Sequence, residues 1–189
     1  MKQLLRILKR LLIGLVLVLV LVGAFFFAKW KWVSHRNHQR LGDRALILTI
    51  DGFSYRDLNK NGQLDPYEDR RLPLEQRLED VLSQMTLEEK AGAMFIQMAA
   101  MNEDGFYNDI PILSEPATFF FEANTTMIAR KLMNHFNIFQ SPSSLALANW
   151  NNHVQALAER TRLGIPITVA SDPRHVTSFT TGADIVTPF

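Results

Sequence analysis

Residues 150–170 read WNNHVQALAERTRLGIPITVA, and this stretch decides the predicted fold. Its first part belongs to a helix that begins at Pro142 and runs to about Arg162, with inward apolar side chains at helical spacing at Leu145, Ala148, Val154, Leu157 and Ala158. Gly164 stands where a helix C′ glycine is expected, and residues 165–170 then form a buried strand. A helix linked closely to a buried strand is the repeating unit of a parallel sheet or βα barrel.

The preceding part of the chain continues this alternation. A helix over residues 74–85 places apolar side chains on one face, at Leu74, Leu78, Val81, Leu82 and Met85. Thr86 caps a second short helix, with Glu89 three residues later as a capping box. The other expected elements are a strand over 45–50, a strand over 95–98, a loop over 102–121, a helix over 123–133 and a strand over 136–139. These elements predict an α/β fold.

The charge of the chain is divided between two unlike parts. Residues 1–44 hold nine Lys or Arg and one acid, a net charge of +8, whereas residues 45–189 hold 11 basic and 18 acidic residues, a net charge of −7. A basic end joined to an acidic body is typical of a targeting or membrane-contacting segment on a soluble domain. The acidic body argues against nucleic acid as a partner. The absence of cysteine excludes disulfides and Cys-ligated zinc.

Residues 11–28, LLIGLVLVLVLVGAFFFA, carry no charge. As a helix they would be about 27 Å long, close to the bilayer hydrocarbon thickness of ~30 Å. The run is flanked by lysines, arginines and two tryptophans, which suit membrane interfaces (Lys2, Arg6, Lys9, Arg10, Lys29, Trp30, Lys31 and Trp32). We expect residues 1–28 to be an uncleaved anchor or signal helix and residues 29–44 a basic tether. The alternative is a cleaved signal peptide, although Phe26 before Ala28 fits a cleavage site poorly.

Residues 57–68, DLNKNGQLDPYE, match a twelve-residue EF-hand loop. Gly62 stands at the sharp turn, and the expected ligands are Asp57, Asn59, Asn61, Gln63 (through its carbonyl), Asp65 and Glu68. A hard cation prefers six to eight oxygens, and alternate residues of such a loop point inward. The flanks are not two long amphipathic helices, so the prediction is a structural calcium clip in a segment spanning 45–73. The alternative is a polar turn whose Asn and Asp side chains bond their own backbone.

Two ordered motifs identify a family resemblance. Residues 57–94, DLNKNGQLDPYEDRRLPLEQRLEDVLSQMTLEEKAGAM, contain at 77–90 a counterpart of the signature R-x-x-D-L-L-x-x-M-T-L-E-E-K. Residues 150–175, WNNHVQALAERTRLGIPITVASDPRH, match the pattern A-E-x-T-R-L-G-I-P…D-x-x-H-G. Both motifs resemble the N-terminal portion of glycoside hydrolase family 3, the β-glucosidase-like enzymes. The resemblance covers roughly residues 53–189.

The resemblance implies a (β/α)8 TIM-like barrel, of which residues 74–189 would form an incomplete N-terminal part. It implies retaining exo-hydrolysis of β-linked gluco-oligosaccharides without a catalytic cofactor, by a nucleophile and an acid/base. Asp172 corresponds to the family's aspartate that holds sugar hydroxyls, and His175 to a histidine that supports this site. Read alone, Asp172 is equally consistent with a cap of the next turn. Val176 replaces the usual glycine after the histidine.

The family's nucleophile and acid/base would lie beyond Phe189, so this chain alone is expected to be inactive. Its usual work on external saccharides places the body outside the cytoplasm, on the periplasmic or extracellular side, anchored or, alternatively, cleaved and secreted. The charges beside the apolar run do not decide orientation. Two other interpretations stay open: a self-contained, membrane-anchored, calcium-binding module without catalysis, and a truncated, non-functional gene product.

Overall fold

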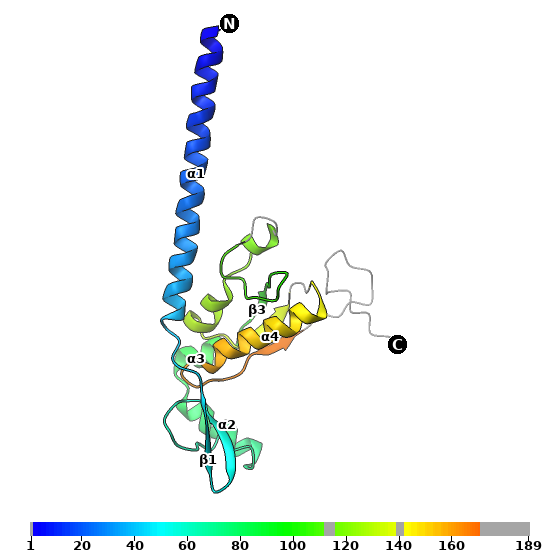
Figure 1. The fold of residues 1–189 in the computed structure, drawn as a ribbon. Coiled ribbons are helices and arrows are strands. Elements are labelled where there is room, and N and C mark those ends of the chain that lie inside the picture. The colour runs from blue at the N-terminus through cyan, green and yellow to red at the C-terminus, as the bar shows by residue number, and fades with distance from the viewer. Residues whose placement is uncertain (1, 112–115, 139–141, 171–189) are drawn as a thin grey trace.

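The computed structural model describes residues 2–111, 116–138 and 142–170 (Figure 1). Its helices are α1 (Lys2–His38), α2 (Leu74–Gln84), α3 (Leu87–Ala93) and α4 (Ser144–Glu159), with a 3-10 turn η1 (Pro116–Phe119) and a π-helical turn η2 (Thr126–Arg130). Its strands are β1 (Leu46–Ile50), β2 (Phe53–Asp57), β3 (Ile96–Ala99), β4 (His135–Ile138) and β5 (Thr168–Ala170). The predicted mixture of helices and strands is confirmed.

The strands form two sheets. β1 and β2 make an antiparallel hairpin, whose two-residue turn places Asp51 and Gly52 at positive φ (47° and 77°), as a type I′ connection requires. β3, β4 and β5 form a parallel sheet in chain order, in which Phe136 of β4 pairs with Gln97 of β3 and Val169 of β5. The predicted strands 95–98 and 136–139 are each displaced by one residue, and Phe139 lies outside the described residues.

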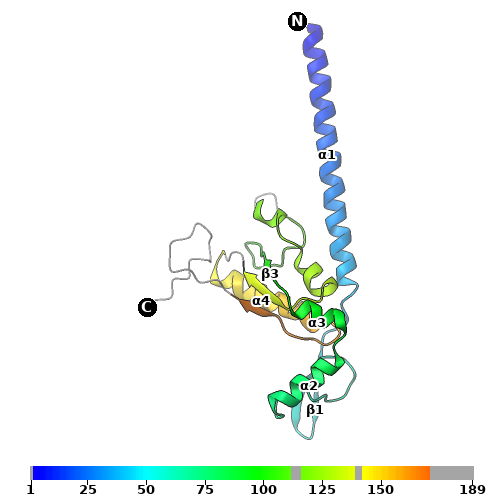
Figure 2. The ribbon, with the colours of Figure 1, turned by 180° about the vertical axis from the view of Figure 1, so that it is seen from behind.

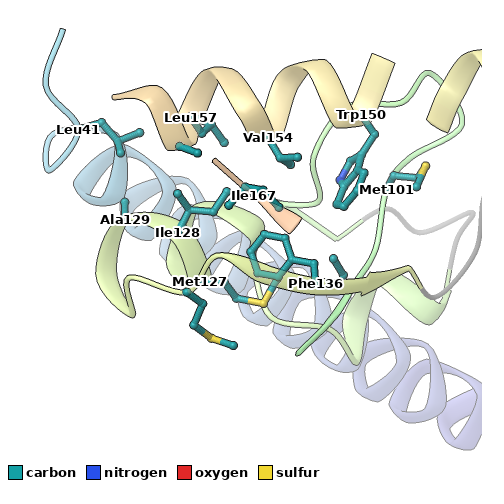
Figure 3. Packing of buried hydrophobic residues seen from close by; sticks show 13 residues of the cluster. Leu41, Met101, Met127, Ile128, Ala129, Phe136, Trp150, Val154, Leu157 and Ile167 are labelled. Carbon is teal, nitrogen blue, oxygen red and sulfur yellow. The ribbon is translucent and has the colours of Figure 1, made fainter. Parts of the chain in front are cut away.

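The hydrophobic core lies between this sheet and α4. Figure 3 shows Trp150, Val154 and Leu157 of α4 directed at Phe136 and Ile167. Trp150, Val154 and Phe136 are fully buried. Each such side chain contributes roughly 1.5–3 kcal/mol by its removal from water, so this contact holds the sheet and helix together.

The inward face of α4 differs from the prediction at its first turn. Ser143 is the N-cap and its Oγ accepts a hydrogen bond from Ala146 N at 3.1 Å. Leu145 is 71 % exposed and Ala148 is also exposed, whereas Ala146 and Trp150 are buried. The large Trp150 ring sets the rotation of the helix against the sheet, so the stripe contains 146, 150 and 154. The inward positions predicted for Leu145 and Ala148 were wrong.

The chain after α4 also differs. The helix ends at Glu159, so Gly164 is not its C′ residue. Gly164 instead occupies a later turn with φ +59°, where its N–H donates to Thr161 O. The glycine is therefore needed for its positive φ, but at another place in the fold than predicted.

The helix predicted over 123–133 is shortened to residues 124–130, of which the last five, Thr126–Arg130, form the π-helical turn η2. Four residues of η2 are buried, Thr126, Met127, Ile128 and Ala129. Asn124 and Thr125 just before it are fully buried, and the N–H of Thr125 donates to Asp109 Oδ1 at 3.0 Å. Asp109, from a distant loop, thus caps the N-terminal end of this helix, and the helix stops after Arg130 because the backbone turns to positive φ at Leu132 (56°).

α1 continues ten residues beyond the apolar run and ends against the body. The predicted tether over 29–44 is therefore helical as far as His38, and Leu41 joins the core. Asn37 is 2 % exposed and donates to Thr126 Oγ1 at 2.7 Å. α1 is long and apolar enough to cross a bilayer, and none of its apolar run is buried, properties that an anchor and a signal sequence share.

Candidate functional site

The three parallel strands end at one edge of the sheet. β3, β4 and β5 finish at Ala99, Ile138 and Ala170. In βα folds this carboxyl edge carries the substrate site. Asp172 and His175 follow β5 by two and five residues, but both lie outside the described residues.

The face of the sheet opposite the core is mixed, with Ile96 and Met98 of β3 beside polar side chains of β4 and β5. His135 and Asn137 of β4 alternate with the core residue Phe136, so they point to the other face, as does Thr168 of β5, which pairs with His135. Asn137 Oδ1 is buried and accepts no hydrogen bond within the described part of the chain. Asn137 is thus a buried polar group near the end of β4 that sequence reasoning missed, because a lone asparagine in a strand gives no signal.

The EF-hand-like loop closes around its own acidic side chains. Asp57, at the end of β2, is 3 % exposed and accepts hydrogen bonds from Asn61 N at 3.0 Å and Gly62 N at 2.9 Å. Gly62 has the positive φ (77°) that the predicted sharp turn needs. Glu68, at the other end, accepts from Leu58 N at 2.6 Å. The two ends of the loop are thereby drawn together.

The remaining predicted ligands lie in the same loop. The carboxamides of Asn59 and Asn61 donate to Asp65 Oδ2 at 2.7 and 2.6 Å, and Gln63 N donates to Asn61 Oδ1. Burial raises the pKa of Glu68, and this effect outweighs the hydrogen bonds from backbone N–H groups, which lower the pKa. Among the described residues no three His, Asp or Glu side chains converge as a metal cluster. The described loop therefore satisfies its oxygens internally, as the alternative polar turn would.

A lysine fixes this loop to the body. Lys60 lies at φ +62° and its Nζ donates to the carbonyls of Glu159 and Thr161, both at 2.6 Å. Glu159 is the last residue of α4 and Thr161 lies in the turn just after it, where a cation is favoured by the helix dipole. Burial lowers the pKa of Lys60, partly offset by nearby acids such as Glu159. Sequence reasoning missed this role, since position 4 of an EF-hand loop carries no required residue.

The two family motifs meet at an ion pair. Arg162 forms a two-pronged pair with Glu89, with Nε to Oε1 at 3.0 Å and a second, shorter contact through Nη2. The same Nη2 donates to Gln84 O at the end of α2. Glu89 also completes the predicted capping box with Thr86, which is confirmed. One arginine therefore joins α2, α3 and the turn before β5.

The comparisons with known proteins point to β-glucosidases. The chain is 40 % identical over 131 residues, 69 % of its length, to a periplasmic beta-glucosidase/beta-xylosidase of Dickeya chrysanthemi. It is 34 % identical over 125 residues, 64 % of its length, to a probable beta-glucosidase C of Aspergillus oryzae, and 35 % identical over 128 residues, 66 % of its length, to beta-glucosidase C of Emericella nidulans. The predicted resemblance to the N-terminal portion of glycoside hydrolase family 3 is confirmed.

The chain spans about a fifth of the length of these curated relatives, 19 % of the Dickeya protein and 18 % of each fungal protein named. No family model matches it.

Proposed function

We propose that this chain forms the first part of the barrel domain of a glycoside hydrolase that cleaves β-linked gluco-oligosaccharides outside the cytoplasm. The 40 % identity to the periplasmic Dickeya enzyme carries this proposal. The parallel order β3, β4, β5, with α4 between β4 and β5, is the connection that a βα barrel repeats, and it supports the proposed architecture.

The open surfaces of the described residues support a larger barrel. Parallel sheets are normally covered on both faces, yet Ile96 and Met98 of β3 are 58 % and 41 % exposed. α2 likewise exposes members of the apolar stripe that was predicted on one face of this helix, at Leu74, Leu78 and Leu82. We propose that further strands and helices of the same domain cover these surfaces in the working enzyme.

In this proposal Asp172 accepts hydrogen bonds from sugar hydroxyls at the carboxyl edge of the sheet, and His175 supports it. An ionised carboxylate is suited to this role because it accepts several hydrogen bonds and donates none. Retaining hydrolysis needs two further carboxyl groups about 5–5.5 Å apart. The family resemblance places neither in this chain, so the chain alone is proposed to bind the sugar weakly and not to turn it over.

A chimera tests the proposal. The matched segment of the Dickeya enzyme is replaced by the corresponding residues of this chain, and hydrolysis of an aryl β-glucoside is measured. The chimera is expected to turn over, whereas the same enzyme with the segment deleted is not. A folded chimera, verified by cooperative unfolding, that lacks all activity would contradict the proposal.

We also propose that residues 57–68 bind a structural Ca²⁺ ion. The closed loop, the buried Asp57 and Glu68 and the positive φ of Gly62 fit a cation held by carboxylate and amide oxygens. Such an ion would draw the loop tighter beneath Lys60 and the end of α4. In this case the loop stabilises the body and takes no part in hydrolysis.

Calorimetric titration of the full chain in detergent with Ca²⁺ tests this site. Calcium is expected to bind and to raise the unfolding temperature, and Asp65→Asn to weaken binding at least tenfold. The matched control Asp51→Asn lies in the hairpin turn, where asparagine tolerates positive φ, and should leave binding unchanged. Equal heats of Ca²⁺ binding for Asp65→Asn and Asp51→Asn would contradict the calcium site and leave the polar turn as the interpretation of this loop.

We propose, finally, that α1 remains attached and holds the body at the membrane. Its length and apolar surface and the periplasmic Dickeya relative support this location. The cleaved and secreted form predicts a mature N-terminus near residue 29, which N-terminal sequencing of the expressed protein would detect.

A further inference from the structure

One aromatic segment of the body lies beside the membrane-facing part of α1. The Phe119 ring contacts the Trp30 ring edge to face, with 5.7 Å between the ring centroids. Phe120 next to it is 86 % exposed and Phe119 is 43 % exposed. Figures 1 and 2 show η1 at the far end of an arm that rises from the body on the side of the N-terminal part of α1, and the chain after η1 returns to the body.

The sequence of α1 gives the depth of this contact. Its uncharged run ends at Ala28 and is followed by Lys29, Trp30, Lys31 and Trp32. Tryptophan and lysine in this position mark the boundary between hydrocarbon and headgroups. Because Phe119 touches Trp30, it lies at the same level as this boundary.

Hydrogen bonds hold the body against the end of α1. Ser34 Oγ donates to Asp109 Oδ2 at 2.6 Å, and Thr125 Oγ1 donates to the same oxygen at 2.8 Å. Asn37 donates to Thr125 and Thr126, and all three residues are at least 96 % buried. The body therefore does not hang from a flexible tether, and its orientation relative to α1 is fixed.

We infer that Phe119 and Phe120 form a second membrane contact, inserted into the interfacial region of the leaflet that α1 leaves at Trp30. This inference rests on the proposed anchoring by α1. An exposed phenylalanine pair in water is unfavourable, whereas the interface accepts aromatic rings readily. The partner is a lipid surface, continuous with the one that α1 crosses. The contact would hold the body at a constant height and tilt above the bilayer.

The chain has no cysteine, so single cysteines can carry an environment-sensitive fluorophore. Three variants of the full chain are placed in phosphatidylcholine–phosphatidylglycerol vesicles with and without lipids that carry a quencher near the headgroup or along the acyl chain. Leu19→Cys reports anchoring, Phe120→Cys reports the inferred contact, and Ile47→Cys is the control. Ile47 is 68 % exposed on the hairpin, at the end of the molecule opposite the N-terminus (Figure 1).

We expect the quencher lipids to reduce the fluorescence of the Leu19 and Phe120 probes by at least half and to leave the Ile47 probe unchanged. For Phe120 the loss should be largest with the quencher near the headgroup. Quenching at Leu19 without quenching at Phe120 would overturn the inference and leave the anchor intact. A blue-shifted Phe120 probe that lipids do not quench would indicate contact with another protein copy, and would also overturn it. If Leu19 is not quenched, the proposed anchoring fails and the inference fails with it.

Discussion

At the scale of single residues, the side chain of Lys60 joins the EF-hand-like loop to the C-terminal end of α4. Its ammonium donates to the carbonyl of Glu159, at the end of α4, and to that of Thr161 in the following turn, while its backbone at φ +62° lets the loop reverse direction. A lysine rarely takes this conformation, and in this loop Asn61 and Gly62 complete the turn that it begins. The loop and the helix end are therefore stabilised by the same side chain.

Replacing this lysine should weaken the body measurably. Lys60→Met keeps the aliphatic stem but removes both hydrogen bonds, and we expect the free energy of unfolding to fall by about 1–2 kcal/mol. The control Lys90→Met, on the exposed surface of α3, should change it by less than about 0.5 kcal/mol. Urea unfolding in detergent measures both, and equal losses would refute the capping role.

Gly164 gives a second prediction at this scale. Its φ is +59°, and an added Cβ would lie 3.0 Å from Leu58 Cβ and 3.1 Å from Leu58 O. We expect Gly164→Ala to cost about 2 kcal/mol or more, from backbone strain and this contact. Gly52→Ala is the matched control, because Gly52 has φ +77° but nothing within 4 Å of its Cβ position.

The difference between these two alanine variants isolates the contact with Leu58 from the strain of positive φ. Equal destabilisation in urea titrations would mean that the loop and the turn before β5 are not tightly packed. A larger loss for Gly164→Ala would support the close packing described.

At the scale of elements, the Glu89–Arg162 pair joins α3 to the turn before β5. The net effect on the pKa of Glu89 is a lowering: burial raises it, but the Arg162 guanidinium and the N–H of Thr86 lower it further. The folded protein then binds the proton of this carboxyl less tightly than the unfolded chain. The stabilisation is complete above the unfolded pKa of about 4.3 and is lost as the pH falls through the folded value.

Glu89→Gln should therefore flatten the acid limb of the stability curve. Between about pH 5 and pH 3, we expect the variant to lose less free energy of unfolding than the native chain, while being about 1 kcal/mol less stable at pH 7. Glu88→Gln, an exposed neighbour on α3, serves as the control and should follow the native curve. Identical acid limbs for all three proteins would contradict the role of the pair.

Local features of the elements were predicted well from the sequence. The capping box at Thr86 and Glu89 and the positive φ of Gly62 depend on neighbours within five residues, and the structure confirms both. The end of the helix before β4 and the inward face of α4 are not signalled by local periodicity. The backbone turns to positive φ at Leu132 (56°), which ends the first helix, and the buried ring of Trp150 orients α4.

At the scale of the whole molecule, the sequence separated an apolar N-terminal segment from an α/β body correctly, but it predicted a basic tether between them over residues 29–44, whereas α1 continues to His38. The polar residues 34–38 seemed suited to a tether because their partners, Asp109, Thr125 and Thr126, are about 70 to 90 positions away in the chain. A polar helix surface and a solvated linker have the same composition. Only the fold distinguishes them.

For the candidate sugar site as well, the sequence motif extends beyond the described part of the fold. The sequence motif assigns roles to Asp172 and His175 by resemblance, and the described sheet ends at Ala170, two residues before the first of them. The parallel order of β3, β4 and β5 supports a site at that edge, and Asn137 adds a polar group there. The role of Asp172 is therefore the part of the account that most needs a direct measurement.

That measurement is kcat/KM for an aryl β-glucoside in the chimera with the Dickeya enzyme, with and without Asp172→Asn. If Asp172 holds sugar hydroxyls in the transition state, the substitution lowers kcat/KM by about 100-fold or more, roughly 2.7 kcal/mol, without changing the unfolding temperature. The control Glu79→Gln, on the exposed surface of α2, leaves it unchanged. Full activity in the Asp172→Asn chimera would contradict the proposed sugar site.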